Sequence, residues 1–242
     1  MRIIADLHTH TDACPHGHSP RYQYIEYAKS RGLYAVGISE HCQGYPDGVP
    51  MSYFEDMENW PRVVDGLRLL RGVEIDINDY RGRVYMQRRY MKHLDYVIAS
   101  THRSSLLPCD ALTATRMWCG VAELPFVDVI GHPCREHDLW PYEVDTVVRA
   151  FRDHGKTVEI NASSFGKPLH LETCRKIMEC CGKYEVPIIV GSDSHYAVGT
   201  GRFDPAIRVL EEVGIPETQV VNASLPRLLA WLDAHSYDHS AK

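Results

Sequence analysis

The sequence predicts an α/β fold in which parallel strands form a barrel. Short runs rich in β-branched residues alternate with stretches of helical periodicity along the 242 residues, a pattern typical of strands joined by helical crossovers. Residues that can bind metals follow most of these strands, and a barrel gathers the carboxyl ends of its strands on one rim. An open doubly wound sheet is the alternative, but the chain has no GxGxxG or GxxxxGK[ST] motif to support it.

Seven strands are expected, each a short apolar run bounded by polar residues, glycine or proline. In chain order they are Arg2–Leu7, Tyr34–Ser39, Leu69–Ile77, Tyr96–Ser100, Val127–Gly131, Thr157–Asn161 and Pro187–Gly191. Helical periodicity is found at Tyr22–Ser30, Tyr142–Asp153, Leu171–Lys183, Pro205–Val213 and Pro226–His235. No repeat or linker interrupts this order, so we expect residues 1–242 to form a single domain with a flexible tail at about residues 236–242.

The composition is that of an ordinary globular protein with an acidic balance. The formal net charge is -6 and no basic run of five or more residues occurs, so we expect no nucleic-acid partner. Neither a signal peptide nor an apolar run of membrane-spanning length is present, so we expect a cytoplasmic protein without a membrane partner. The eight cysteines form no CxxC pair and are expected to be reduced, mostly buried residues.

Histidines and carboxylates follow six of the seven strands, at the point where each strand ends. Residues two apart on a strand share a face, so neighbouring pairs such as His8 and His10 point the same way. One HxH pair alone is a weak signal, but six occurrences at strand ends predict a ring of metal ligands on one rim. The donors are His8 and His10, His41, Glu74, His102, His132, and Asp193 with His195; the remaining strand runs into Asn161.

The donor types indicate a hydrolytic metal site. Imidazole and carboxylate without thiolate suit Zn, Mn or Fe rather than a structural cysteine site. The donors are too many for one tetrahedral ion and suit two or three ions, with a carboxylate such as Glu74 bridging a pair. Neighbouring ions share a hydroxide and clamp both sides of an in-line displacement. Three divalent ions would outweigh two carboxylates, so the cavity would attract a phosphate ester even in an acidic chain.

These motifs resemble those of the PHP (polymerase and histidinol phosphatase) family. The resemblance rests on ADLHTHTDACPHGHS at the start, ISEH, RGVEIDI, the THR at 101, GHP at 131 and GSDSH, which occur in the family's order over nearly the whole chain. It is strongest to the short stand-alone bacterial phosphatases. It implies a distorted (β/α)7 barrel, TIM-barrel-like, with a trinuclear metal site that cleaves phosphate monoesters through a metal-bridging hydroxide.

The resemblance also implies how the ligands divide among three divalent ions, with zinc the first expectation and manganese or iron as alternatives. One ion would take His8, His10, Glu74 and Asp193, a second would share Glu74 and add His102 and His132, and a third would take His16, His41 and His195. Glu74 and Asp193 are the expected catalytic residues, because Glu74 bridges and Asp193 can orient the hydroxide or handle a proton. The third ion would help to bind the phosphoryl oxygens.

Several nearby residues leave alternatives open. His18 competes with His16 for one place, and the spacing from HxH favours His16. Glu40 is an alternative to His41, and Asp76 is either a partner of a ligand histidine or an ordinary loop carboxylate. The loop 45–53 either lines the mouth of the pocket or is a plain surface loop.

Arginines are expected to assist, because the guanidinium fork matches phosphate oxygens. Arg103 and Arg135 closely follow His102 and His132 and are the expected substrate residues. Arg202 lies seven residues beyond His195 and is expected to be an ordinary surface residue.

The expected partner is a small phosphorylated substrate, and histidinol phosphate is one candidate that nothing in the sequence selects. The alternatives are a phosphodiesterase or exonuclease of the same family, an amidohydrolase-type C–N hydrolase, and a non-catalytic metal or phosphate binder. The C–N hydrolases typically use a strand-borne lysine, which none of the seven strand runs contains. Some short family members are trimers, so a homo-oligomer is a further expectation.

Overall fold

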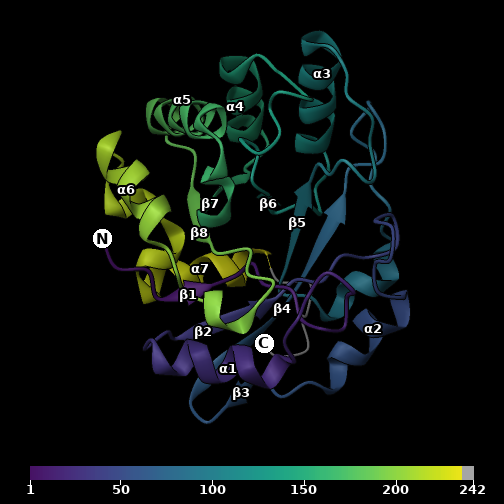
Figure 1. The fold of residues 1–242 in the computed structure, drawn as a ribbon, viewed down its shortest axis with the longest axis vertical. Helices are drawn as coiled ribbons and strands as arrows, with labels where there is room; N and C mark the ends of the chain where they lie inside the picture. The colour runs from purple at the N-terminus through teal and green to yellow at the C-terminus, as the bar shows by residue number, and fades with distance from the viewer. Residues whose placement is uncertain (236–242) are drawn as a thin grey trace.

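Seven parallel strands run round an almost closed barrel in the computed structural model, which describes residues 1–235 (Figure 1). Hydrogen-bonded neighbours follow the order β1-β2-β4-β5-β6-β7-β8, and a short β3 pairs antiparallel with β4. The distorted (β/α)7 barrel predicted from the sequence is confirmed, whereas the expected tail lies outside the described residues. The strands are β1 (Ala5–Asp6), β2 (Ala35–Ile38), β3 (Val63–Val64), β4 (Leu67–Asp76), β5 (Tyr96–Ser100), β6 (Val129–Ile130), β7 (Thr157–Asn161) and β8 (Ile188–Gly191).

Helices surround the barrel, with α3, α4 and α5 grouped at one end of the view and α1 and α2 at the other (Figure 1). Among residues 1–235, none of the helices combines the length and the apolar character needed to cross a bilayer. The helices are α1 (Arg21–Ser30), α2 (Met51–Asp56), α3 (Ala111–Ala122), α4 (Val144–Asp153), α5 (Pro168–Tyr184), α6 (Asp204–Glu212) and α7 (Leu225–His235). Short 3-10 segments are η1 (Met57–Asn59), η2 (Arg88–His93), η3 (Ala162–Gly166), η4 (Ala197–Gly199), η5 (Glu217–Gln219) and η6 (Val221–Ala223).

All five expected helices are present, but α2, α3 and β3 were not expected. Helix α3 begins after Asp110, whose side chain accepts a hydrogen bond from the Thr113 backbone N–H at 2.8 Å. Such an N-cap is a sequence signal for a helix start. Strands β1 and β6 are shorter than expected, with two residues each.

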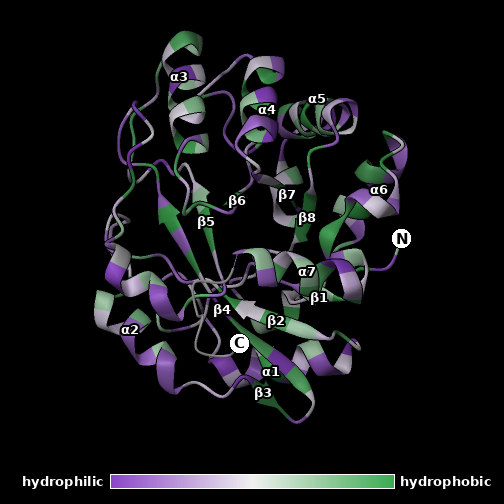
Figure 2. Ribbon diagram, turned by 180° about the vertical axis from the view of Figure 1, so that it is seen from behind, coloured by the Kyte–Doolittle hydropathy of each residue, from purple (hydrophilic) through white to green (hydrophobic). Residues whose placement is uncertain are grey.

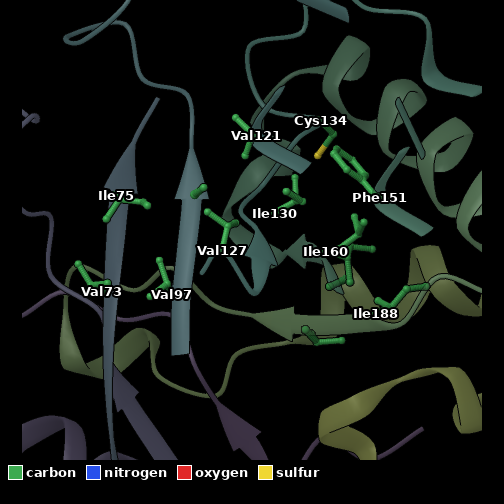
Figure 3. Close-up of a cluster of buried hydrophobic side chains, with 14 of the residues drawn as sticks. Val73, Ile75, Val97, Val121, Val127, Ile130, Cys134, Phe151, Ile160 and Ile188 are labelled. Carbon is green, nitrogen blue, oxygen red and sulfur yellow. The ribbon is translucent and has the colours of Figure 1, made fainter. Parts of the chain in front are cut away.

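A first core lies between the outer face of the barrel and the helices. Outward-facing residues of the strands, such as Val97 on β5 and Ile160 on β7, belong to one buried cluster with Val121 of α3 and Phe151 of α4 (Figure 3). The strands are largely hydrophobic, while the helices carry hydrophilic residues toward the outside (Figure 2). This is the pattern expected where helices cover a parallel sheet.

A second core fills the inside of the barrel. Side chains alternate along β5, so Tyr96 and Ile98 face inward. Trp231 of α7 packs in the same cluster, and its indole N–H donates to Thr157 Oγ1 at 2.8 Å, at the start of β7. Helix α7 therefore covers the amino-terminal opening of the barrel, and the opposite rim is left for the polar residues.

One side chain completes the barrel where β8 and β1 do not pair as strands. The Asn222 amide donates to the carbonyl oxygens of Ala5 and Val190, each at 2.8 Å, and its oxygen accepts from the Val190 N–H at 3.1 Å. At the rim, an isolated parallel bridge between Thr9 and Ser194 joins the segments that follow β1 and β8. This junction of β8 and β1, the seam of the barrel, thus holds the donors that follow β1 beside those that follow β8.

Candidate metal centre

Strand β1 delivers the first two donors to the rim. His8 and His10 lie just beyond β1 and are almost wholly buried. Their Nε2 atoms are 3.1 Å apart. The His10 N–H donates to the Ser194 carbonyl at 2.9 Å, which ties this segment to the one that carries Asp193 and His195.

Glu74, near the end of β4, stands at the centre of the site. Its Oε2 lies 3.3 Å from Nε2 of His8 and of His10, and 3.1 Å from His41 Nδ1. Its Oε1 lies 2.9 Å from His132 Nε2 and 3.6 Å from His102 Nε2. One buried carboxylate therefore faces five histidines, which come from the segments after β1, β2, β5 and β6.

The segment after β8 closes the group. Asp193 Oδ1 lies 3.2 Å from His10 Nε2 and 3.5 Å from His8 Nε2, and its Oδ2 lies 2.7 Å from the Arg135 guanidinium. Asp193 and His132 have positive φ angles of 51° and 28°. Such backbone conformations cost about 1–3 kcal/mol for residues other than glycine and are concentrated at functional sites.

The distances between these donors fit metal binding. A tetrahedral zinc ion with bonds of about 2.0–2.1 Å requires donor atoms about 3.3–3.4 Å apart. The separations among the facing donor atoms of His8, His10 and the two carboxylates run from 3.1 to 3.5 Å. Glu74 Oε2 and His41 Nδ1 are 3.1 Å apart, yet both are buried and neither makes a hydrogen bond. Unpaired buried atoms of this kind are expected where a cation binds.

Four overlapping groups of donors could hold an ion. They are His8, His10 and Asp193; His8, Glu74 and His132; His41, Glu74 and His102; and His10, His41 and His195. Eight of the nine ligands predicted from the sequence are brought together in these groups. The structure places His10, rather than His16, with His41 and His195.

His16 lies at the margin of the site. Its ring centroid is 6.2 Å from that of His41, and its Nε2 is buried without a hydrogen-bond partner. His18 is exposed and packs against Tyr196, with ring centroids 4.5 Å apart. The His18 backbone N–H also donates to the His195 carbonyl at 2.8 Å, so the choice of His16 over His18 as a ligand stays a prediction.

Carboxylates behind the donors hold the histidines in place. Glu159 Oε1 is 2.8 Å from His8 Nδ1, and its Oε2 accepts from the His132 N–H at 2.9 Å. Asp76 binds His102 Nδ1, which answers the question that the sequence left open. Glu40 accepts from the backbone and hydroxyl of Thr11, while His41 belongs to two of the donor groups. Such partners fix which ring nitrogen is available to a metal.

Glu159 was missed in the sequence. It lies inside β7, in TVEIN, and the prediction considered only residues at strand ends. The signal was a charged residue between aliphatic neighbours on a buried strand, which requires a buried partner. Tyr45 begins the loop 45–53, and its ring stacks on His41 with centroids 4.0 Å apart, so this end of the loop borders the donors.

The electrostatics of the group favour charged carboxylates. Burial opposes charge on Glu74, but His8, His41 and His102 hold the pKa of its carboxyl well below the usual value. Burial also opposes charge on Asp193, and Arg135 and His8 hold its pKa well below the usual value. Burial, assisted by the charge of His10, lowers the pKa of His195 to about 4. His195 is therefore neutral near pH 7, with a free ring nitrogen.

The two predicted substrate arginines differ in their environment. Arg135 contacts Asp193 and the Ser163 hydroxyl, so it lies beside the donors. Arg103 pairs with Glu136, and its side chain is 52% exposed. Both arginines line one cleft, together with Lys167.

Comparisons with known proteins identify the family that this chain resembles. Residues 6–163 match the PHP domain family. A probable phosphatase of Caldanaerobacter subterraneus subsp. tengcongensis is 34% identical over 96% of this chain and 92% of its own length. A probable phosphatase of Clostridium botulinum (strain Hall) is also 34% identical, over 96% of this chain and 95% of its own length.

A solved structure with a similar fold supports the same architecture. It is the histidinol phosphate phosphatase of Lactococcus lactis subsp. lactis, solved with zinc, L-histidinol and phosphate. The match has a TM-score of 0.66 and covers 89% of this chain and 95% of that chain, at 16% sequence identity.

Proposed function

Because the chain belongs to the PHP domain family and is a metal-dependent phosphatase, we propose that it hydrolyses small phosphate monoesters in a centre of three divalent ions. The observation that carries this proposal is the buried Glu74 carboxylate, which faces five histidines at 2.9–3.6 Å. Cations between the Glu74 carboxylate and the imidazoles around it explain why so many polar groups are buried together, because burying them without partners is costly.

The proposed ligands follow the grouping expected from the sequence. His8, His10, Glu74 and Asp193 would hold one ion, Glu74, His102 and His132 a second, and His16, His41 and His195 a third. Zinc suits this nitrogen and oxygen donor set, as do manganese and iron. When bound, the ions supply a water of lowered pKa as nucleophile and positive charge for the phosphoryl oxygens.

The chain's own residues would orient the reaction. Asp193 is charged, so it can accept a proton or orient the nucleophile but cannot donate a proton in this state. The Arg135 guanidinium, 2.7 Å from Asp193, is placed to contact a phosphoryl oxygen at the same site. Arg103, which is more exposed and already paired with Glu136, is the weaker substrate candidate.

The substrate is proposed only as a class, a small phosphorylated molecule. Histidinol phosphate is one candidate, since the Lactococcus structure with this fold is a histidinol phosphate phosphatase. The absence of a nucleic-acid or membrane partner, the cytoplasmic location and a homo-oligomer such as a trimer stay predictions.

The test is p-nitrophenyl phosphate hydrolysis by chelator-treated protein, with zinc, manganese or iron added back. We expect added metal to restore turnover in the parent protein but not in the His8→Ala/His195→Ala double variant. His154→Ala is the matched control, because His154 is exposed at the end of α4, and it should behave like the parent. Elemental analysis would give the number of bound ions in each sample.

About three bound ions with no turnover of this monoester would contradict the proposed reaction while leaving the metal centre intact. Assays with bis(p-nitrophenyl) phosphate and with amide substrates would then distinguish a phosphodiesterase from a C–N hydrolase. Turnover that survives both chelation and the double variant would contradict the metal centre itself.

A further inference from the structure

A cleft of about 930 Å³ opens beside Asp193 and His195 and runs to the start of α6. Pockets for small ligands have volumes of about 300–1,000 Å³, so this cleft can hold much more than a phosphoryl group. The metal centre lies at one end of it. The proposed phosphatase reaction uses nothing at the other end.

That far end carries positive charge. Arg202 and Arg208 line it, both residues are exposed, and within residues 1–235 neither makes an ion pair. Asp204 is the one carboxylate among the lining residues of this described cleft apart from Asp193. Two arginines therefore face a single acid, and their guanidinium groups are available to a ligand.

The wall between the two ends is held in a fixed shape. Arg31 donates to the carbonyl oxygens of Val198, at 2.8 Å, and of Thr200. The Ala197 N–H donates to Ser19 Oγ at 3.1 Å, and a Cβ on Gly199 would lie 2.4 Å from Ser194 Oγ. The segment that carries Tyr196 and leads to Arg202 is thus positioned before any ligand binds, which lowers the entropic cost of binding.

We propose that Arg202 and Arg208 bind a second anionic group of the substrate, so that preferred substrates are phosphomonoesters with another anion several atoms away. The inference rests on the proposed function, since it assumes that the phosphoryl group lies at the metal centre. Carboxylates and phosphates both match the planar guanidinium fork, and either would serve as the second anion.

The test compares three alkyl probes in the metal-loaded enzyme. Propyl phosphate carries one anionic group, an ω-phosphooxy carboxylate adds a carboxylate, and an alkanediol bisphosphate adds a phosphate. The two bifunctional probes are made with tethers of several lengths. We expect at least one to exceed propyl phosphate in kcat/KM by about tenfold or more, the effect of one charge-assisted contact. The better of the two series identifies the second anion.

In the Arg202→Gln/Arg208→Gln variant, kcat/KM for the bifunctional probe should fall to about that for propyl phosphate, mainly because the KM for the bifunctional probe rises. Arg116→Gln is the matched control, because Arg116 is an exposed arginine on α3, on the other side of the molecule from α6 (Figure 1). It should leave every ratio unchanged.

Two failures can be told apart. If the enzyme hydrolyses propyl phosphate but no tether length gives an advantage, or if the advantage survives the double variant, the arginine subsite is wrong and the phosphatase reaction stands. If none of the probes and no p-nitrophenyl phosphate is hydrolysed with any metal, the proposed function fails and the inference fails with it.

Discussion

Glu159 shows how a fully buried residue outside the predicted ligand set can position two of the ligands. One of its oxygens binds His8 Nδ1 and the other accepts from the His132 backbone N–H. His8 follows β1 and His132 follows β6, and β7 and β8 lie between these two strands in the barrel. His8 therefore presents its Nε2 to the cavity. The orientation of one ligand and the backbone of another depend on the same carboxylate.

We expect Glu159→Gln to weaken metal binding by about 10- to 100-fold. The amide replaces one oxygen by NH2, so either His8 or the His132 N–H faces a donor instead of an acceptor. Titration of the chelated protein against a chromophoric chelator measures the change. Glu172→Gln, at an exposed glutamate of α5, is the control, and equal affinity in all three proteins would contradict the role given to Glu159.

The two predicted substrate arginines should differ in their effect on turnover. Arg135→Ala removes a guanidinium beside Asp193 and is expected to lower kcat/KM for p-nitrophenyl phosphate by about 10- to 100-fold, the value of a charged hydrogen bond. Arg103→Ala should change it much less, because Arg103 is half exposed and paired with Glu136. Steady-state kinetics at matched metal content measures both, and an equal loss would show that the structure ranks them wrongly.

Sequence reasoning was strongest for residues whose position on an element fixes their direction. His8 and His10, or Asp193 and His195, follow parallel strands, so topology alone brings them to one rim. It was weaker where a loop sets the place, as for His16. It could not find the partner of His8, because Glu159 and His8 are 151 residues apart in the chain.

At the scale of elements, one tyrosine of β5 sets how closely β2 and β4 pack against it inside the barrel. Tyr96 of β5 extends across the interior, and its hydroxyl donates to the Leu7 carbonyl. A Cβ on Gly37 of β2 would lie 2.0 Å from the Tyr96 hydroxyl oxygen, and a Cβ on Gly72 of β4 would lie 2.5 Å from the ring. The two glycines are required by this side chain.

We expect Gly37→Ala to lower the free energy of unfolding by about 1–3 kcal/mol through overpacking. Tyr96→Phe should relieve part of this cost, since the clash is mainly with the hydroxyl. Gly72→Ala should not be relieved, because there the ring carbons are in the way. Urea unfolding of the single and double variants measures the coupling, and equal rescue of the two glycine variants would contradict this account.

The elements themselves were largely predictable, because buried parallel strands are short apolar runs with clear boundaries. Helix α3 escaped notice although Asp110 caps it and Ala114, Met117, Trp118 and Val121 are all buried on its inner face. Strand β3, with two residues beside a turn at Gly66, is too short to show a period in the sequence.

At the scale of the whole molecule, the centre joins segments from nearly every part of the chain. Donors at positions 8 to 195 meet around one carboxylate. Ions bound there would act as cross-links between the two sides of the barrel. A ligand that binds only the folded state stabilises it in proportion to the logarithm of its excess over the dissociation constant.

Chelation is therefore expected to lower the thermal midpoint. Metal at about 1,000 times its dissociation constant contributes about 4 kcal/mol, which corresponds to a shift of about 10 °C for a chain of this size. Scanning calorimetry with chelator, and again after zinc is restored, measures the shift. A midpoint unchanged by chelator in protein shown by elemental analysis to lose its metal would contradict the cross-linking role.

The barrel closure has a consequence for the order in which the protein is made. Every donor of the centre has been synthesised once His195 is reached. The side chain that joins β8 to β1 is Asn222, however, and α7, which covers the amino-terminal opening of the barrel, ends at His235. During synthesis the ligands are thus complete before the frame that aligns them. A nascent chain that ends between His195 and Asn222 would contain every predicted metal ligand but would lack the residues that close the barrel around them.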